Sequence, residues 1–158
     1  MSLNDFINLI KKIVEEANLL KNKYTTETYA PVNYACIFCH SDDEYIEFRQ
    51  LASNLGNIIE ETHSGPLFRI KPLQTVDGKL QLLKIRIFDS EHLDLGDADF
   101  TVSDYSSFKK TYLNKSGFKL IERPEMEMME LMDQKFNSRA YFSNPPLDKQ
   151  FEAKLQEI

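Results

Sequence analysis

The sequence predicts a mixed α+β fold in which two βαβββ units follow one another behind an N-terminal helix. Two observations indicate this. Hydrophobic residues repeat with a helical period near the N-terminus and with a period of two from residue 32 onward. The helix-capping and helix-stopping residues of the first unit then recur, since Ser41-Asp42 corresponds to Ser103-Asp104 and Gly56 to Gly117. A recurrence in this order is typical of a structural repeat.

The composition is that of one ordinary globular domain spanning residues 1–158. With 42% hydrophobic and 28% charged residues, the chain is long enough to form one core. The 19 Lys and Arg residues are dispersed among 25 acids, for a net charge of −6, which argues against a nucleic-acid surface. No apolar run of about 18 residues and no signal-peptide pattern occurs, so we expect no membrane segment and a cytoplasmic protein.

Residues 1–31 are predicted to form an amphipathic helix over residues 2–22 and a connector. Ser2 or Asn4 can cap the helix. Its apolar residues recur at spacings of three and four and form one stripe: Leu3, Phe6, Ile7, Ile10, Ile13, Val14, Ala17 and Leu20. We expect this stripe to dock on the body of the protein. The alternative is an interaction module in which the stripe pairs two chains in a homodimer.

Residues 32–95 are predicted to form the first unit. A strand begins at Val32, is apolar on both faces and ends at His40. Ser41 or Asp42 then caps a helix that stops at Gly56. Turns at Ser64-Gly65 and Asp77-Gly78 separate three further strands, which we place at residues 57–62, 66–71 and 80–88.

Residues 96–146 repeat this order. A strand over residues 97–102 precedes a helix that begins at Ser103-Asp104 and stops at Gly117. Three strands are predicted to follow at residues 118–122, 127–131 and 139–143. Asn144-Pro145-Pro146 ends the last strand, because proline cannot continue a ladder, and residues 147–158 form a charged tail.

Cys36 and Cys39 are predicted to be free thiols. They lie three residues apart in a strand, so their side chains point to opposite faces and a disulfide between them is sterically disfavoured. As a zinc or redox motif they lack a second ligand pair and a following helix, so we expect buried core residues.

Several short segments, together with the two βαβββ units, resemble the vicinal oxygen chelate superfamily and, within it, the YecM-like branch. The segments are Asn33-Tyr34-Ala35-Cys36 leading to Asp43-Glu44-Tyr45, Leu55-Gly56-Asn57-Ile58-Ile59-Glu60, Phe68-Arg69-Ile70 and Gly96-Asp97-Ala98-Asp99-Phe100. The superfamily includes glyoxalases, extradiol dioxygenases and antibiotic-resistance proteins. The resemblance covers nearly the whole chain, and it implies that the mixed sheet is cupped, with each unit forming half of the cup.

The resemblance also implies where a divalent metal would lie. Members hold the metal through His, Gln or Glu on the first and last strand of each unit. On the first strands this sequence places Tyr34 and Asp99, and on the last strands it offers only cations and hydroxyls. A hard divalent ion needs several converging oxygens or imidazoles, so we expect no metal cofactor. The alternative is a metal-dependent lyase, isomerase or dioxygenase with nonstandard ligands.

Cations on the predicted sheet favour a binding site for a small anionic molecule. Lys84 and Arg86 alternate with apolar residues on one strand, and Arg69 does so on the strand before it. The full candidate set is Tyr34, Arg69, Lys84, Arg86, Asp99, Glu127 and Tyr141. One alternative is a solvated sheet face, and another is that Asp99 and Glu127 form structural ion pairs with the cations.

No catalytic residue is predicted. The three histidines, His40, His63 and His92, lie at a strand end, near a hairpin turn and in an acidic loop. The sequence does not place them together, and a general base must lie within hydrogen-bond reach of the proton it takes. We therefore expect each of them to be exposed or to cap a helix.

Overall fold

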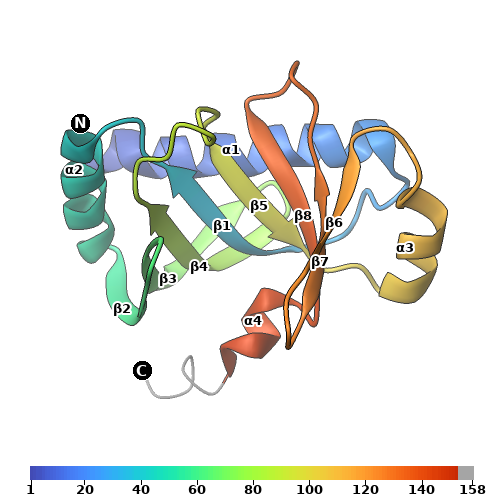
Figure 1. Ribbon diagram of the computed structural model, residues 1–158. Helices are drawn as coiled ribbons and strands as arrows, with labels where there is room; N and C mark the ends of the chain where they lie inside the picture. The colour runs from blue at the N-terminus through green and yellow to red at the C-terminus, as the bar shows by residue number, and fades with distance from the viewer. Residues whose placement is uncertain (153–158) are drawn as a thin grey trace.

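A computed structural model, which describes residues 1–152, contains one eight-stranded mixed sheet and four helices (Figure 1). The predicted α+β fold with an N-terminal helix is confirmed. The elements in chain order are α1 (Leu3–Tyr24), β1 (Val32–Phe38), α2 (Asp42–Ser53), β2 (Gly56–Thr62), β3 (Gly65–Thr75), β4 (Gly78–Arg86), β5 (Gly96–Phe100), α3 (Tyr105–Tyr112), β6 (Phe118–Glu122), β7 (Glu127–Leu131), β8 (Ser138–Asn144) and α4 (Leu147–Gln150).

The sheet is built from two units that meet at their first strands. Its strand order is β2-β3-β4-β1-β5-β8-β7-β6. β1 and β5 pair antiparallel across Ala35 and Ala98, and each also pairs in parallel with the last strand of its own unit, β4 or β8. The remaining pairs are antiparallel. The two halves therefore have the same topology, as the repeated caps and glycines predict.

The helices begin where the capping residues predict. Ser2 accepts a hydrogen bond from the backbone of Asp5 and completes a capping box at α1, while Ser41 and Asp104 cap α2 and α3. These side chains satisfy backbone N–H groups that have no partner inside the helix. The local sequence thus accounts for the start of each long helix.

Strand β3 extends well beyond its predicted end. β3 continues past residue 71 to Thr75, because its end pairs with the start of β4 after a register shift between Arg69 and Leu73. Pro72 lies inside that shift, where the absence of a backbone N–H breaks no regular ladder. The irregularity lets one strand carry a proline and still form a long hairpin.

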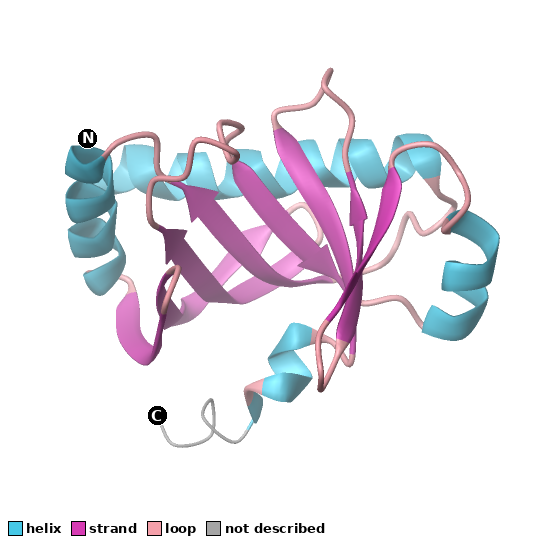
Figure 2. Ribbon diagram, viewed as in Figure 1, coloured by secondary structure: helices cyan, strands magenta, loops and turns pink. Residues whose placement is uncertain are grey.

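Helix α1 lies across one face of the sheet, where it contacts β3, β1, β5 and β8 (Figure 2). The sheet residues beneath it form a row that includes Ala35, Leu83, Ala98 and Ala140. On the helix, the residues that face this row are fully buried: Phe6, Ile10, Ile13, Val14, Ala17 and Leu20. Six of the eight predicted stripe residues are thus docked within the chain, as expected, whereas Leu3 is exposed and Ile7 is half-buried. None of the helices in residues 1–152 is long and apolar enough to cross a membrane.

The docking of α1 on the sheet predicts that two substitutions on this helix lower the free energy of unfolding by different amounts. Ile13 is fully buried against the sheet, so Ile13→Ala leaves a cavity and should lower the free energy of unfolding by about 2–5 kcal/mol. Leu19 is 52% exposed, so Leu19→Ala should stay within about 0.5 kcal/mol of the wild type. Urea denaturation measures both, and equal costs would contradict the packing described for α1.

Candidate functional site

The face of the sheet opposite α1 lines a cavity of about 480 Å³. Both units contribute, because all eight strands supply lining residues. The residues Leu147, Gln150 and Phe151, in and beside α4, complete its wall. The predicted cup therefore encloses a space of the size that small-molecule sites have.

The strand register brings together five of the seven predicted site residues. Tyr34 pairs with Asp99, which in turn pairs with Tyr141 on β8. Lys84 lies beside Cys36 on β1, and Arg86 follows two residues later on the same face of β4. Because cross-strand partners share a face, these side chains project together, and all five predicted residues line the cavity.

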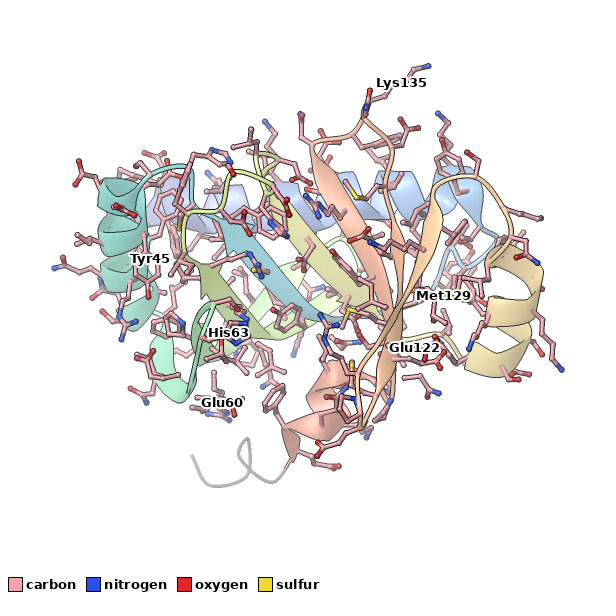
Figure 3. All side chains as sticks on the ribbon, viewed as in Figure 1. Tyr45, Glu60, His63, Glu122, Met129 and Lys135 are labelled. Carbon is pink, nitrogen blue, oxygen red and sulfur yellow. The ribbon has the colours of Figure 1, made fainter. Side chains whose placement is uncertain are left out.

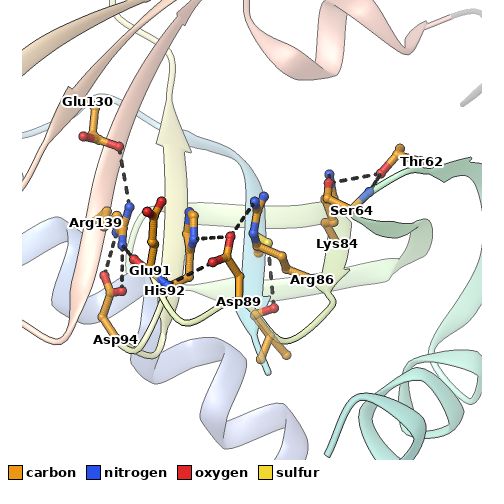
Figure 4. A network of polar contacts seen from close by, with 12 residues as sticks. Thr62, Ser64, Lys84, Arg86, Asp89, Glu91, His92, Asp94, Glu130 and Arg139 are labelled. Atoms are coloured by element: carbon orange, nitrogen blue, oxygen red, sulfur yellow. Dashed lines mark hydrogen bonds and ion pairs between the residues drawn. The ribbon is translucent and has the colours of Figure 1, made fainter. Parts of the chain in front are cut away.

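Lys84 and Arg86 are half-buried cations with few partners (Figure 4). Lys84 Nζ donates to Ser64 Oγ at 2.5 Å, and Arg86 Nη2 lies 3.5 Å from Asp89 Oδ2. Arg86 Nε is buried and has no hydrogen-bond partner within residues 1–152. Burial lowers the pKa of Lys84, because the charged ammonium loses hydration. The sheet thus presents positive groups that the surrounding protein leaves only partly satisfied.

Two carboxyl groups on β5 face the same cavity. Asp99 is fully buried and accepts a hydrogen bond from Ser143 Oγ at 2.6 Å, while Asp97 is 8% exposed. Asp97 Oδ1 and Asp99 Oδ2 have no hydrogen-bond partner in the described part of the chain. Burial, with the charge of Asp99 second, raises the pKa of Asp97 to about 8, and burial raises the pKa of Asp99 to about 7. Both groups therefore titrate near neutral pH.

Asp97 and Glu130 are cavity residues that are missing from the predicted set. Asp97 lies two residues before Asp99 in an alternating strand, so the period of two already placed both on one face. Glu130 accepts a hydrogen bond of 2.5 Å from the Tyr141 hydroxyl, and β7 pairs Glu130 with Tyr141. No local pattern in the sequence indicates this second contact, because it depends on how β7 aligns with β8.

Arg69 and Glu127 lie outside the cavity lining, in contrast to the prediction. The register places Arg69 beside Leu82, on the face of Lys84 but farther along the strands. Glu127 accepts a hydrogen bond of 2.7 Å from the Tyr105 hydroxyl and pairs with Lys109 Nζ at 2.8 Å, so it fastens β7 to α3. Strand parity predicts a face, but it does not predict how far along that face the cavity extends.

The structural ion pairs considered for Asp99 and Glu127 do not form in residues 1–152. Asp99 bonds Ser143, and Glu127 bonds α3 rather than either cation of β4. The one arginine opposite Asp97, Arg139, is held elsewhere: it pairs with both carboxylate oxygens of Asp94, at 2.8 and 3.1 Å (Figure 4). Cations and carboxyl groups thus face one cavity without pairing directly.

Two of the three histidines line the cavity. His63, labelled in Figure 3, is exposed in the turn between β2 and β3, and His92 packs edge-on against Phe38. His92 Nδ1 lies 3.0 Å from Asp89 Oδ2, yet burial is the larger influence and lowers the pKa of His92. His40 lies away from the cavity, where its backbone N–H donates to Glu44 at 3.0 Å. His40 and His63 are exposed, as expected, whereas His92 is half-buried and departs from the expectation.

The donor set at the positions implied by the resemblance does not fit a divalent metal. Of Tyr34, Asp99, Lys84 and Tyr141, only Asp99 offers a carboxylate, and one of its oxygens already accepts from Ser143. The Tyr141 hydroxyl donates to Glu130, and the ammonium of Lys84 cannot ligate while charged. Within residues 1–152, no group of three or more His, Cys, Asp or Glu side chains is arranged to hold a metal ion.

Comparisons with known proteins show similarity of fold. No protein-family model matches the chain, and no curated protein matches it. A solved structure described as "Structural Genomics, Protein EC4020" is similar, with a TM-score of 0.71, 12% identity, and coverage of 98% of this chain and 92% of that chain. A glyoxalase/bleomycin resistance protein/dioxygenase superfamily member from Vibrio splendidus 12B01 has a TM-score of 0.49 and 7% identity, over 72% of this chain and 97% of that chain. At such identities the likeness concerns the fold alone.

The carboxyl groups on β5 predict that stability falls as pH rises. The pKa of Asp97, about 8 in the folded protein, lies above its ordinary value of 3.8, so the folded state binds the proton more tightly than the unfolded state. The contribution of Asp97 to the free energy of unfolding is therefore fully present below about pH 4, and it is lost progressively as the pH rises to about 8. We expect the free energy of unfolding of Asp97→Asn to fall by about 3–4 kcal/mol less than that of the wild type between pH 5 and pH 8 in urea denaturation, since the difference grows by about 1.4 kcal/mol for each pH unit.

A matched control separates this effect from a general response to pH. Glu125→Gln makes the same carboxyl-to-amide change in an exposed turn. The free energy of unfolding of this variant should change with pH as that of the wild type does. Parallel profiles for Asp97→Asn and the wild type would mean that Asp97 is ionised at ordinary pH in the folded protein.

Proposed function

We propose that the protein is a divergent member of the vicinal oxygen chelate superfamily that binds a small anionic molecule in its cup without a metal. The duplicated βαβββ topology, joined at β1 and β5, supports the superfamily assignment. The observation that carries the binding proposal is the pair of half-buried cations, Lys84 and Arg86, facing a cavity of about 480 Å³. Fold alone does not establish a function, so the argument depends on the site.

These two cations suit an anionic group for complementary reasons. An arginine donates in a planar fork that matches a carboxylate or phosphate, and a lysine adds a compact charge. Arg86 has a buried Nε without a partner within residues 1–152, and the hydrogen bond that Lys84 donates goes to a neutral hydroxyl, Ser64. An anion would therefore gain charge-assisted hydrogen bonds without first displacing a carboxylate from Lys84.

The rest of the lining supports a small organic anion rather than a bare inorganic ion. Arg123 adds a third cation to the wall. Met126, Met128, Leu147 and Phe151 add apolar surface against which a carbon skeleton can pack. A few polar groups set in an apolar wall are typical of small-molecule sites.

Anion binding can be tested with succinate and propyl phosphate as probes. By isothermal titration calorimetry we expect the wild type to bind at least one of them, and Lys84→Gln to weaken that binding about tenfold, since one charge-assisted hydrogen bond contributes about 1.5 kcal/mol or more. Lys79→Gln changes an exposed lysine of the same strand and should bind like the wild type. Equal affinities for Lys84→Gln and the wild type, or no binding by the wild type, would contradict the proposal.

The metal-dependent alternative predicts a different result. A lyase, isomerase or dioxygenase with nonstandard ligands requires a stoichiometric Zn, Ni, Mn or Fe ion. Elemental analysis of the purified protein measures this. A stoichiometric ion that is lost in Asp99→Ala would overturn the metal-free proposal, since Asp99 is the one carboxylate at the positions where the superfamily places its ligands.

A further inference from the structure

Cationic side chains and carboxyl groups lie on the two strands that flank β1. The strand order β4-β1-β5 places Lys84 and Arg86 on one side of β1 and Asp97 and Asp99 on the other. Lys84 and Asp97 both pair with Cys36, so they stand in one row across three strands. Strands spaced about 4.8 Å apart separate the backbones of β4 and β5 by roughly 10 Å. The floor of the cavity is therefore polarised across β1.

The protein does not use these charges to satisfy one another. Lys84 donates to Ser64, Arg86 contacts Asp89, and Asp99 accepts from Ser143. The arginine beside Asp97 in the sheet, Arg139, is held by Asp94 and by the backbone carbonyl of Glu91. In a site that served folding alone, such cations and carboxyls would be expected to pair.

Two buried acceptors remain without donors. Asp97 Oδ1 and Asp99 Oδ2 have no hydrogen-bond partner in residues 1–152, and both side chains are more than nine-tenths buried and line the cavity. A buried carboxyl oxygen without a donor costs free energy that a bound group can recover. A hydroxyl or an ammonium group supplies the missing donor.

We propose that the bound molecule is a small anion that also carries hydroxyl or ammonium groups, and that it lies across β1. Its anionic group contacts Lys84 and Arg86, and its donor groups contact Asp97 and Asp99. The inference rests on the proposed anion binding and narrows the ligand class. Hydroxy acids, amino acids and polyol phosphates share this chemistry, whereas simple alkyl carboxylates and alkyl phosphates lack it.

Matched probes test the inference. Malate and succinate differ by one hydroxyl, and glycerol 3-phosphate and propyl phosphate differ by two. By calorimetry we expect the wild type to bind the hydroxylated member of at least one pair about tenfold more tightly, or about 1.4 kcal/mol. The pair that shows the larger effect identifies carboxylate or phosphate as the anionic group. Equal affinities within both pairs would overturn the inference.

Asp97→Ala is the decisive variant, because the Asp97 side chain forms no hydrogen bond within residues 1–152 and its removal leaves no protein group unpaired. We expect it to reduce the preference for the hydroxylated probe, measured as the ratio of the two probe affinities within the same variant, to less than about threefold. Asp97→Asn preserves the shape of the side chain and should reduce the preference in the same direction, since a neutral acceptor is about half as strong. An unchanged preference in both variants would contradict the inference.

The lysine variant distinguishes failure of this inference from failure of anion binding. Lys84→Gln should weaken all four probes by a similar factor and keep the preference for hydroxylated members. If the wild type binds simple and hydroxylated anions equally, the anion-binding proposal is retained and the proposed role of Asp97 and Asp99 is wrong. If the wild type binds none of the four probes, both proposals fall together.

Discussion

The antiparallel pairing of β1 with β5 is the constraint on which the rest of the structure depends. It joins the two units, and it decides which side chains face α1 and which face the cavity. A slip of β1 by one residue would turn Tyr34 toward the apolar face and Ala35 toward the cavity, so neither would share a face with its present partner on β5. Gly96 helps to hold this register, because a Cβ there would lie 2.0 Å from the carbonyl oxygen of Cys36. The close approach of the two strands at that point requires a residue without a side chain.

The same pairing divides the sheet into an apolar face and a polar one. Beneath α1, small residues such as Ala98 and Ala140 let a long helix lie close to the strands, and the core forms there. The opposite face therefore carries polar and charged residues without loss of that core. Because the cavity face is only partly hydrated, charges on it interact more strongly than they would on an open surface. A sheet with one such face can support a stable fold and a charged site at once.

The fold could be predicted from the sequence to a greater extent than the site. Capping residues and hydrophobic periods are local, so Ser41, Asp104 and Gly117 indicated the units before any tertiary contact was known. The adjacency of Tyr34 and Asp99 follows only from the resemblance to a known family, because the pairing of two residues 65 positions apart leaves no local pattern in the sequence. The prediction for Glu127 was wrong because two kinds of partner are chemically equivalent for a carboxylate: a cation of β4 and Lys109 of α3. Only the packing of α3 against β7 brings Lys109 to Glu127. Strand parity places Asp97 on the same face as Asp99, but the resemblance implies a ligand only at the position of Asp99 and gives no role to the pair.

Asp97 and Asp99 are where the sequence departs most from what stability requires. A buried carboxyl group without a full set of donors raises its own pKa and weakens the folded state as it ionises, and apolar residues of similar size at the same positions would avoid both effects. Natural sequences tend to break such local rules at functional sites, where another interaction offsets the cost. A ligand that donates to these oxygens would stabilise their ionised forms and lower both pKa values. The groups that make the free protein sensitive to pH would then also link the protonation of the site to its occupancy, since a proton and a donor group compete for the same carboxyl oxygens.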